Sequence, residues 1–258
     1  MPAQNQTPPT APDTALLLFG HGKSDGGGST VADALAAEIR ARGTFGAVVT
    51  AFALQAPSPA AALDPLPQRR VLVLPLLATE GGVATMVLPR LLAAAADQER
   101  LTVLPPIGMD AEVPGMAADL ADRAIVDAGL DAGAVAVLVA GHGSLKRNAS
   151  QRATGALVAA LESLGRYGEV AAVYLEQPPL ASDWRGVTAR RDVVVVPLFV
   201  SGGRHEEEDL PTLLRAGGAA LDGREVEGRR LWLTPTVGRH PRMADLILRR
   251  ALAALERG

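Results

Sequence analysis

The chain contains no cysteine, only two lysines and few aromatic residues, which make up 3% of its 258 positions. The absence of cysteine excludes disulfide scaffolds, thiolate metal sites, iron–sulfur clusters and cysteine nucleophiles. No apolar stretch approaches the roughly 18 to 20 residues of a membrane-spanning helix, so we expect no membrane partner. With 25 basic and 28 acidic residues the net charge is −3, and no basic surface indicates a nucleic-acid partner.

Residues 1–13 are rich in proline and lack the apolar core of a secretory signal, so they predict a disordered tail. The whole chain is 48% hydrophobic and long enough for one large domain or two of ordinary size. These features are typical of a cytoplasmic globular protein.

The chain contains an internal repeat, and a repeat indicates that the repeated segments adopt similar structures. The repeated pairs are TALLLFGHG (14–22) with VAVLVAGHG (135–143), VLVLPLLATEGGVATMVLP (71–89) with VVVVPLFVSGGRHEEEDLP (193–211), and PPIG (105–108) with PTVG (235–238). The first two offsets are 121 and 122 residues and the third is 130, which places extra residues in the second copy near 221–229. The repeat predicts two similar halves, residues 14–130 and 131–258.

Short runs of Val, Leu and Ala without polar alternation are typical of parallel strands that are buried on both faces. Such runs occupy 14–19, 47–53, 71–76 and 101–104, and again 135–140, 169–175, 193–198 and 230–234. Helical patterns lie between them, as at 30–42, 149–164 and 241–255, where Pro241 would open the helix. We therefore expect an α/β fold with two parallel four-stranded α/β/α domains related by a pseudo-twofold axis.

Two histidines follow the first predicted strand of their halves, each in the tripeptide GHG. His21 and His142 therefore lie at the carboxyl edge of a parallel sheet, where such folds bind ligands. The flanking glycines, such as Gly141 and Gly143, remove side-chain bulk and permit unusual backbone angles. A polar residue that merely caps the sheet edge would also fit, but the recurrence of the tripeptide favours a site.

The second half places two more titratable residues after neighbouring strands. His205 follows the third strand of this half and Glu176 follows the second, so both are expected to reach the crevice beside His142. Two neutral imidazoles and a carboxylate form a three-ligand metal site with open positions. The same groups also suit proton transfer near neutral pH, and both interpretations stay open at this point.

The first half lacks two of these three residues, since Leu54 stands opposite Glu176 and Val83 opposite His205 in the aligned repeat. It keeps only His21, so we expect one working site in the second half and a degenerate copy that forms the opposing wall. The charge distribution agrees, because residues 1–130 carry 8 basic and 13 acidic groups whereas residues 131–258 carry 17 and 15. The second half is thus the more hospitable to an anionic ligand.

Other charged residues near the predicted site have competing interpretations. The acidic run 206–209 suits the first turn of a helix, and it also suits attraction of a divalent cation. Lys146 and Arg147 follow the second GHG and could pair with substrate carboxylates, while Lys23 occupies the similar loop of the first half. His240 precedes the last predicted helix and is interpreted as a helix-entry residue, not a ligand.

Several enzyme classes are excluded by missing residues. The GKS at 22–24 resembles the end of a phosphate-binding loop, but Leu17 stands where that motif needs glycine. No GxGxxG spacing is present, which argues against a dinucleotide site. Neither GHG is preceded by the arginine of histidine phosphatases, and no Ser–His–acid arrangement of a hydrolase is found.

Taken together, these segments resemble the class II tetrapyrrole chelatases, specifically the sirohydrochlorin chelatases of the two-domain CbiX type. The resemblance covers almost the whole chain beyond residue 13 and is most specific from 135 to 250. The motifs that carry it are LLLFGHGKSD, VLVAGHGSLKRNASQRAT, VYLEQPPL, VVVVPLFVSGGRHEEEDLP and PTVGRHPRMADL. It implies two α/β halves facing each other across a cleft for a flat macrocycle.

The resemblance also implies an activity, the insertion of Fe²⁺ or Co²⁺ into sirohydrochlorin for siroheme or cobalamin, with no cofactor beyond the substrate metal. His142, His205 and Glu176 would handle the metal. The residues implied in substrate binding are Lys146, Arg147, Arg204, Gly141 and Gly143. A non-catalytic metal- or tetrapyrrole-binding protein of the same fold is the alternative, and either a monomer or a homodimer is compatible with the sequence.

Overall fold

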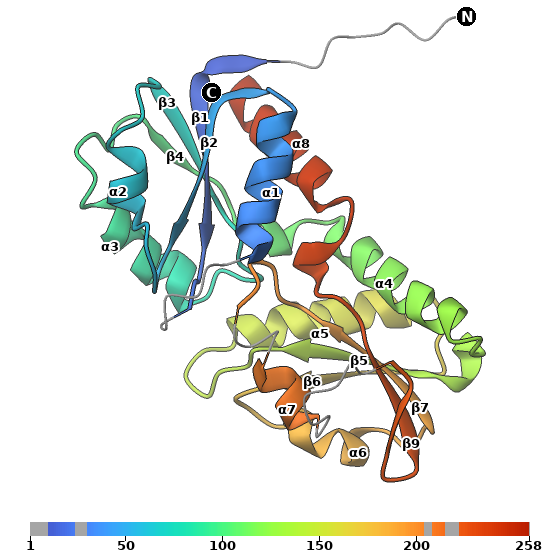
Figure 1. Cartoon of the computed structure of the whole chain (residues 1–258). Coiled ribbons are helices and arrows are strands. Elements are labelled where there is room, and N and C mark those ends of the chain that lie inside the picture. The colour runs from blue at the N-terminus through green and yellow to red at the C-terminus, as the bar shows by residue number, and fades with distance from the viewer. Residues whose placement is uncertain (1–9, 24–29, 204–207, 215–221, 258) are drawn as a thin grey trace, which may run out of the picture.

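The computed structural model describes residues 10–23, 30–203, 208–214 and 222–257, and its strands form two separate sheets (Figure 1). The first sheet has the order β2-β1-β3-β4 and the second has the order β6-β5-β7-β9-β8. All eight predicted strands are present, and they pair with one another in parallel. The strands are β1 (Ala11–Gly20), β2 (Phe45–Phe52), β3 (Arg70–Pro75), β4 (Leu101–Val103), β5 (Ala136–Gly141), β6 (Glu169–Tyr174), β7 (Asp192–Pro197), β8 (Arg224–Val226) and β9 (Arg229–Leu233).

The second sheet departs from the predicted four parallel strands, because β8 joins it as a fifth strand antiparallel to β9. The turn between β8 and β9 consists of Glu227 and Gly228, whose φ angles are +51° and +81°. Two consecutive positive φ angles are the geometry of a tight β-hairpin. The hairpin accounts for the extra residues that the repeat places near 221–229.

Two predicted boundaries are wrong by a few residues. Strand β1 already begins at Ala11, which pairs with Phe45, so Ala11–Asp13 belong to the sheet and not to the predicted tail. The last helix begins at Met243, two residues beyond Pro241. A short 3₁₀ turn at Val237–Arg239 precedes it and delays its start.

The helices lie between the strands, as the alternating pattern predicts. They are α1 (Thr30–Ala41), α2 (Pro59–Leu63), α3 (Leu88–Leu92), α4 (Val113–Asp127), α5 (Ala149–Glu162), α6 (Trp184–Val187), α7 (Leu210–Leu213) and α8 (Met243–Glu256). A π-helical turn at Val83–Val87 leads into α3.

The last helix of each half packs against the sheet of the other half. Helix α4 follows the first sheet in the chain but lies against β7 and α5, whereas α8 follows the second sheet and lies against α1 and β3 (Figure 1). One cluster of buried side chains runs through the molecule as a result, including Leu16, Met116, Val137 and Ile247. The sequence halves are therefore not separate packing units.

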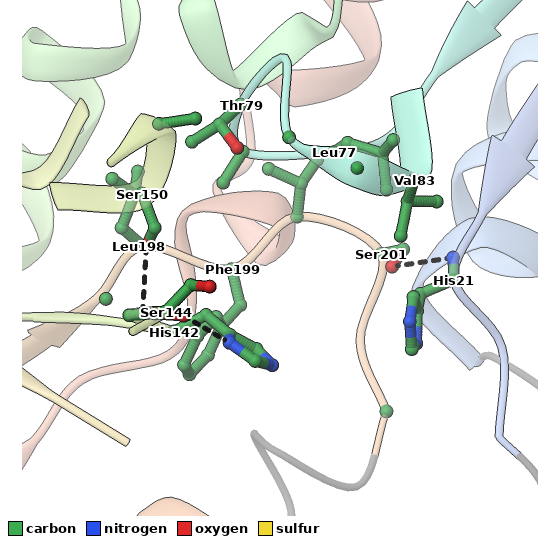
Figure 2. A pocket seen from close by; sticks show the side chains of 18 of the residues that line it. His21, Leu77, Thr79, Val83, His142, Ser144, Ser150, Leu198, Phe199 and Ser201 are labelled. Atoms are coloured by element: carbon green, nitrogen blue, oxygen red, sulfur yellow. Dashed lines mark hydrogen bonds between the residues drawn. The ribbon is translucent and has the colours of Figure 1, made fainter. Parts of the chain in front are cut away.

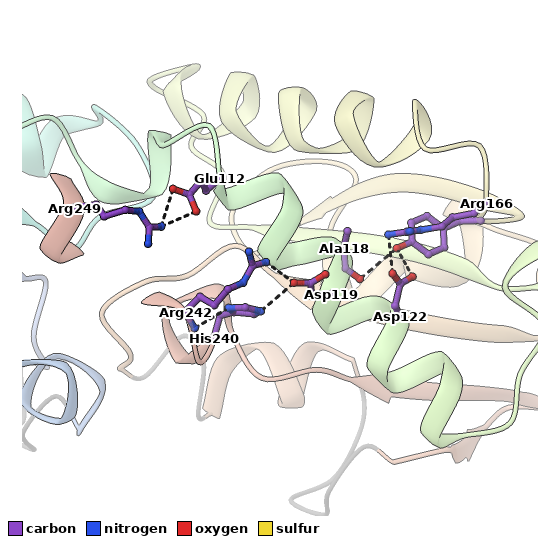
Figure 3. A network of polar contacts seen from close by, with 9 residues as sticks. Glu112, Ala118, Asp119, Asp122, Arg166, His240, Arg242 and Arg249 are labelled. Atoms are coloured by element: carbon purple, nitrogen blue, oxygen red, sulfur yellow. Dashed lines mark hydrogen bonds and ion pairs between the residues drawn. The ribbon is translucent and has the colours of Figure 1, made fainter. Parts of the chain in front are cut away.

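Ion pairs on the surface hold the exchanged helices in register (Figure 3). Arg249 of α8 donates two hydrogen bonds to the carboxylate of Glu112, at 2.8 and 2.7 Å. Arg242 and His240, at the entry to α8, both face Asp119 of α4. Each exposed pair contributes at most about 1 kcal/mol, so the pairs fix geometry while the buried apolar surface provides most of the stability.

The exchanged segments pass close behind the loops that follow β3 and β7. Gly108 donates a hydrogen bond to the carbonyl of Leu77 at 3.0 Å, and Gly238 donates the equivalent bond to Phe199 at 2.9 Å. A Cβ at Gly238 would lie only 1.9 Å from the Val200 carbonyl oxygen. This contact explains why PPIG and PTVG recur, because only glycine lets the two backbones approach so closely.

We expect Gly238→Ala to destabilise the protein by about 1–3 kcal/mol or more, because the new methyl group must displace the backbone of the loop after β7. Gly115→Ala is the matched control, since a Cβ at this helical position would meet no heavy atom within 4 Å. There, alanine should be neutral or stabilising by about 0.5–1 kcal/mol. Urea unfolding of the two variants checks the difference, and equal stabilities would contradict it.

His240 should make the stability of the folded chain pH-dependent. Its Nδ1 accepts a hydrogen bond from the Arg242 backbone at 3.1 Å, and its Nε2 lies 3.6 Å from an Asp119 oxygen. Burial lowers the pKa of His240 from 6.5 and Arg242 lowers it further, whereas Asp119 opposes them. The folded state thus binds fewer protons than the unfolded chain, so this contribution is present above the unfolded pKa and is lost as the pH falls below it.

The measurement is the melting temperature of wild type and His240→Gln between about pH 7.5 and about pH 5.5. The wild type should lose more stability on acidification than the variant, which cannot take up this proton. Parallel curves for the two proteins would show that His240 does not titrate differently on folding.

Candidate functional site

A cavity of about 850 Å³ lies where the carboxyl ends of both sheets meet. Residues from the two halves line it together, and they include His21, Leu54, Val83, His142, Glu176 and Ser201. Figure 2 shows the two imidazoles on opposite sides of this space, with His21 beside Ser201 and His142 beside Ser144. The structure therefore places the two GHG loops around one cavity, at the sheet edge where parallel folds bind ligands.

His142 and Glu176 lie close together on one wall. The His142 Nδ1 is 2.9 Å from the Gly143 carbonyl oxygen and 3.7 Å from the Glu176 Oε2. A proton on Nδ1 satisfies these acceptors and leaves Nε2 as the acceptor atom of the neutral ring, the form that binds a metal or takes up a proton. Both side chains are accessible, at 40% and 58% exposure.

The predicted glycines Gly141 and Gly143 both line the cavity, and close packing requires them. A Cβ at Gly141 would lie 2.2 Å from the Thr154 Oγ1. Gly143 has φ +78°, and a Cβ there would lie 2.7 Å from the Gln177 Cγ. These contacts press the loop onto β6 and α5, which fixes the direction in which His142 projects.

Gln177 is a site-supporting residue that the sequence analysis missed. It is buried, and its Oε1 accepts a hydrogen bond from the Ser144 backbone at 2.7 Å. Gly143 donates a further bond to the Ser150 Oγ at 2.9 Å, so two side chains hold the backbone next to His142. The signal that could have revealed Gln177 is its recurrence as Gln55 in the first half.

The first half repeats this backbone arrangement closely. Gln55 accepts a hydrogen bond from the Lys23 backbone at 2.7 Å, as Gln177 does from Ser144. Leu54 donates to the His21 carbonyl at 3.0 Å, which matches the bond from Glu176 to His142. The two walls thus share one backbone design and differ in the side chains that it presents to the cavity.

Two of the three predicted metal ligands lie in the part of the chain that the structure describes. The structure brings His142 and Glu176 together, but His205 and Arg204 lie outside the described residues. Within the part of the chain that the structure describes, no group of three histidine, aspartate or glutamate side chains is arranged to hold a metal. Gly202 and Gly203, which precede Arg204 and His205 in the chain, line the cavity, and so does Asp209, which follows them.

The predicted cations of the second GHG loop also border the cavity. Lys146 and Arg147 are exposed at its edge, and Lys23 lines it from the first half. The Arg147 Nη2 reaches across to the Met86 Sδ of the first half at 2.7 Å. Cations at this edge are suited to the carboxylates of an anionic ligand.

The sequence matches the family described as CbiX over residues 15–124 and 136–254. The chain belongs to the CbiX family. This confirms the resemblance inferred from the repeated motifs. The chain is 30% identical to a probable sirohydrochlorin cobaltochelatase of Halobacterium salinarum, over 93% of this chain and 91% of the relative.

Solved structures of similar fold support the assignment. A CbiX described as the terminal enzyme of siroheme biosynthesis in denitrifying bacteria is 25% identical, with a TM-score of 0.70 over 93% of this chain and 99% of that one. SirB from Bacillus subtilis with Fe³⁺ is 20% identical, with a TM-score of 0.69 over 93% and 94%. The longer DR2241 from Deinococcus radiodurans is 23% identical, with a TM-score of 0.71 over 92% of this chain and 54% of that one. The last two show the fold alone.

None of the helices in the described ranges is long and apolar enough to cross a bilayer.

Replacement of Gln177 by leucine should weaken Co²⁺ binding about tenfold, the usual lower range for loss of a residue that orients a metal ligand. The Ser144 amide then loses its acceptor, and the loop that carries His142 keeps only the bond from Gly143 to Ser150 of these two. Isothermal titration calorimetry with Co²⁺ checks this. Gln55→Leu is the matched control in the first half and should bind Co²⁺ as the wild type does; equal losses would show that the two loops are equivalent.

Proposed function

We propose that this protein inserts a divalent metal ion, Fe²⁺ or Co²⁺, into a sirohydrochlorin-like tetrapyrrole. The proposal is supported above all by the His142–Glu176 pair, which faces a cavity that both halves of a CbiX-family chain enclose. The relative from Halobacterium salinarum is named as a probable cobaltochelatase of the same substrate. A volume of about 850 Å³ is at the upper end of the range for small-molecule sites and suits a large, flat ligand.

The residues fit the chemistry of metal insertion. When a divalent ion replaces the two N–H protons of a free-base tetrapyrrole, both protons must pass to bases. His142 can take up a proton at Nε2, and Glu176 lies 3.7 Å from its Nδ1 and stabilises the imidazolium that forms. His205, which lies two residues beyond the cavity-lining Gly203 in the sequence, is proposed as the third member of the set.

The metal is substrate here, so the site must hold it loosely. An incomplete set of imidazole and carboxylate ligands leaves positions open and the ion exchangeable. Such ligands bind first-row divalent ions in the Irving–Williams order, so the choice between Fe²⁺ and Co²⁺ depends on supply and geometry. The reaction needs no cofactor beyond the metal that it inserts. One chain supplies both walls of the cavity, so a monomer suffices and a homodimer is compatible.

A non-catalytic metal- or tetrapyrrole-binding protein is the second candidate. The observation that favours it is the loss of charged side chains from the first half, where Leu54 and Val83 line the cavity. This candidate predicts binding of metal and macrocycle without formation of the metallated product.

His142→Ala should lower the rate of Fe²⁺ or Co²⁺ insertion into sirohydrochlorin at least about 100-fold, because a positioned base is lost. His205→Ala and Glu176→Gln should lower it as well. Anaerobic absorption spectroscopy of the product measures the rate. His21→Ala is the control in the first half and should retain most of the activity.

Full activity in His142→Ala and His205→Ala would refute the assigned roles, and an inactive His21→Ala would move the site to the first half. A wild type that binds sirohydrochlorin and Co²⁺ without insertion would establish the second candidate instead.

A further inference from the structure

Only two of the 25 lysine and arginine residues in the chain are lysines, Lys23 and Lys146, and both line the cavity. One further cation among the described residues, Arg147, lines it with them. Everywhere else in the sequence a basic side chain is an arginine. Lysine therefore occurs only at the cavity, and its use there calls for an explanation in the chemistry of the site.

Arginine makes forked, lasting contacts in the rest of the molecule. Arg230 donates to both oxygens of Asp192, at 2.6 and 2.8 Å, and Arg249 donates to both oxygens of Glu112. Arg100 donates to three backbone carbonyls. These contacts use the planar fork of the guanidinium, whereas the lysine ammonium is a compact charge on a flexible stem. A lysine thus suits a partner that binds and leaves.

The backbone of each lysine is fixed by one hydrogen bond, while its side chain is free to reorient. The Lys23 amide, directly after the first GHG, donates to the Gln55 Oε1 at 2.7 Å. The Lys146 amide, in the loop after the second GHG, donates to the Ser144 Oγ at 3.3 Å. Both ammonium groups are therefore carried on anchored stems beside the cavity.

The two lysines come from opposite walls of the cavity. Lys23 lies two residues beyond His21 and Lys146 four residues beyond His142. Figure 2 shows these two histidines on opposite sides of the space. The first half, which has no counterpart of Glu176, thus still contributes a charged side chain to the cavity.

We propose that Lys23 and Lys146 bind carboxylates on opposite edges of the tetrapyrrole and so clamp the ring between the two walls. The inference rests on the proposed function and adds Lys23, from the first half, to the residues that bind the substrate. The carboxylates of such a ring lie on substituents at its rim, where an ammonium group from either wall can meet one of them.

The clamp also explains why lysine is used. Metal insertion changes the centre of the ring and leaves its rim unchanged, so the same contacts hold substrate and product equally well. The product must nevertheless leave after each turnover. A single ammonium contact on a flexible stem permits this release more readily than a bidentate guanidinium does.

The test measures tetrapyrrole binding in Lys23→Gln, Lys146→Gln and the double variant. Uroporphyrin, a planar polycarboxylate, and free-base sirohydrochlorin are the probes, and fluorescence quenching gives their dissociation constants. Each single variant should bind about three- to tenfold more weakly, because one charge-assisted hydrogen bond is lost. The two losses should multiply in the double variant, since the lysines hold separate carboxylates. Raising the salt concentration should shrink both losses.

Two control variants keep the test specific. Arg123→Gln removes a cation of α4 that is 78% exposed, pairs with Asp127 and does not line the cavity, so its binding should equal that of the wild type. Lys23→Arg keeps the charge, so it should bind uroporphyrin at least as tightly and release it more slowly in stopped-flow measurements. In Lys23→Gln the melting temperature and Co²⁺ binding should match the wild type, and KM for the tetrapyrrole should rise more than kcat falls.

Unchanged uroporphyrin binding in Lys23→Gln, or an equal loss in Arg123→Gln, would overturn the clamp and leave the proposed function intact. A double variant that binds no more weakly than the single variants would also overturn it, because the two lysines would then share one carboxylate. So would a Lys23→Arg variant as weak as Lys23→Gln. A wild type that binds neither probe would refute the proposed function itself, and that result is read from the unmodified protein alone.

Discussion

The exchange of the last helices is the constraint on which the rest of the structure depends. Each sheet is covered by helices of its own half and also by one helix of the other half, since α4 packs against β7 of the second sheet and α8 against β3 of the first. The chain therefore passes twice behind the strand ends, at Gly108 and Gly238, in direct backbone contact with the loops after β3 and β7. The packing of the core therefore also determines the spacing of the two cavity walls.

The strands can be predicted from the sequence, whereas the packing of α4 and α8 on the sheet of the other half cannot. Unbroken Val, Leu and Ala runs identify strands buried on both faces, and β1 and β5 are indeed buried along almost their whole length. An amphipathic helix, in contrast, has the same pattern whichever sheet it covers, so α4 and α8 carry no sign of their destination. Strand β8 escapes notice because it is short and mostly exposed at the edge of the sheet.

The sequence predicts the residues whose side chains face the cavity. It does not predict the residues whose side chains only hold the backbone of the site in place. The GHG repeat and strand-end placement lead to His142 and Glu176, which the structure brings within 3.7 Å. Gln177 could not be found in this way, since its contribution is one hydrogen bond to the Ser144 amide that only coordinates reveal.

The two halves show how one backbone supports two surfaces of different chemistry. In each half a glutamine, Gln55 or Gln177, accepts a hydrogen bond from the backbone of the GHG loop. Neither glutamine is predicted to bind the metal. The side chains of Leu54 and Glu176 line the cavity and lie outside the core. They can therefore differ between the halves while the fold stays the same. A repeat whose two copies face each other can therefore become asymmetric through its exposed positions alone.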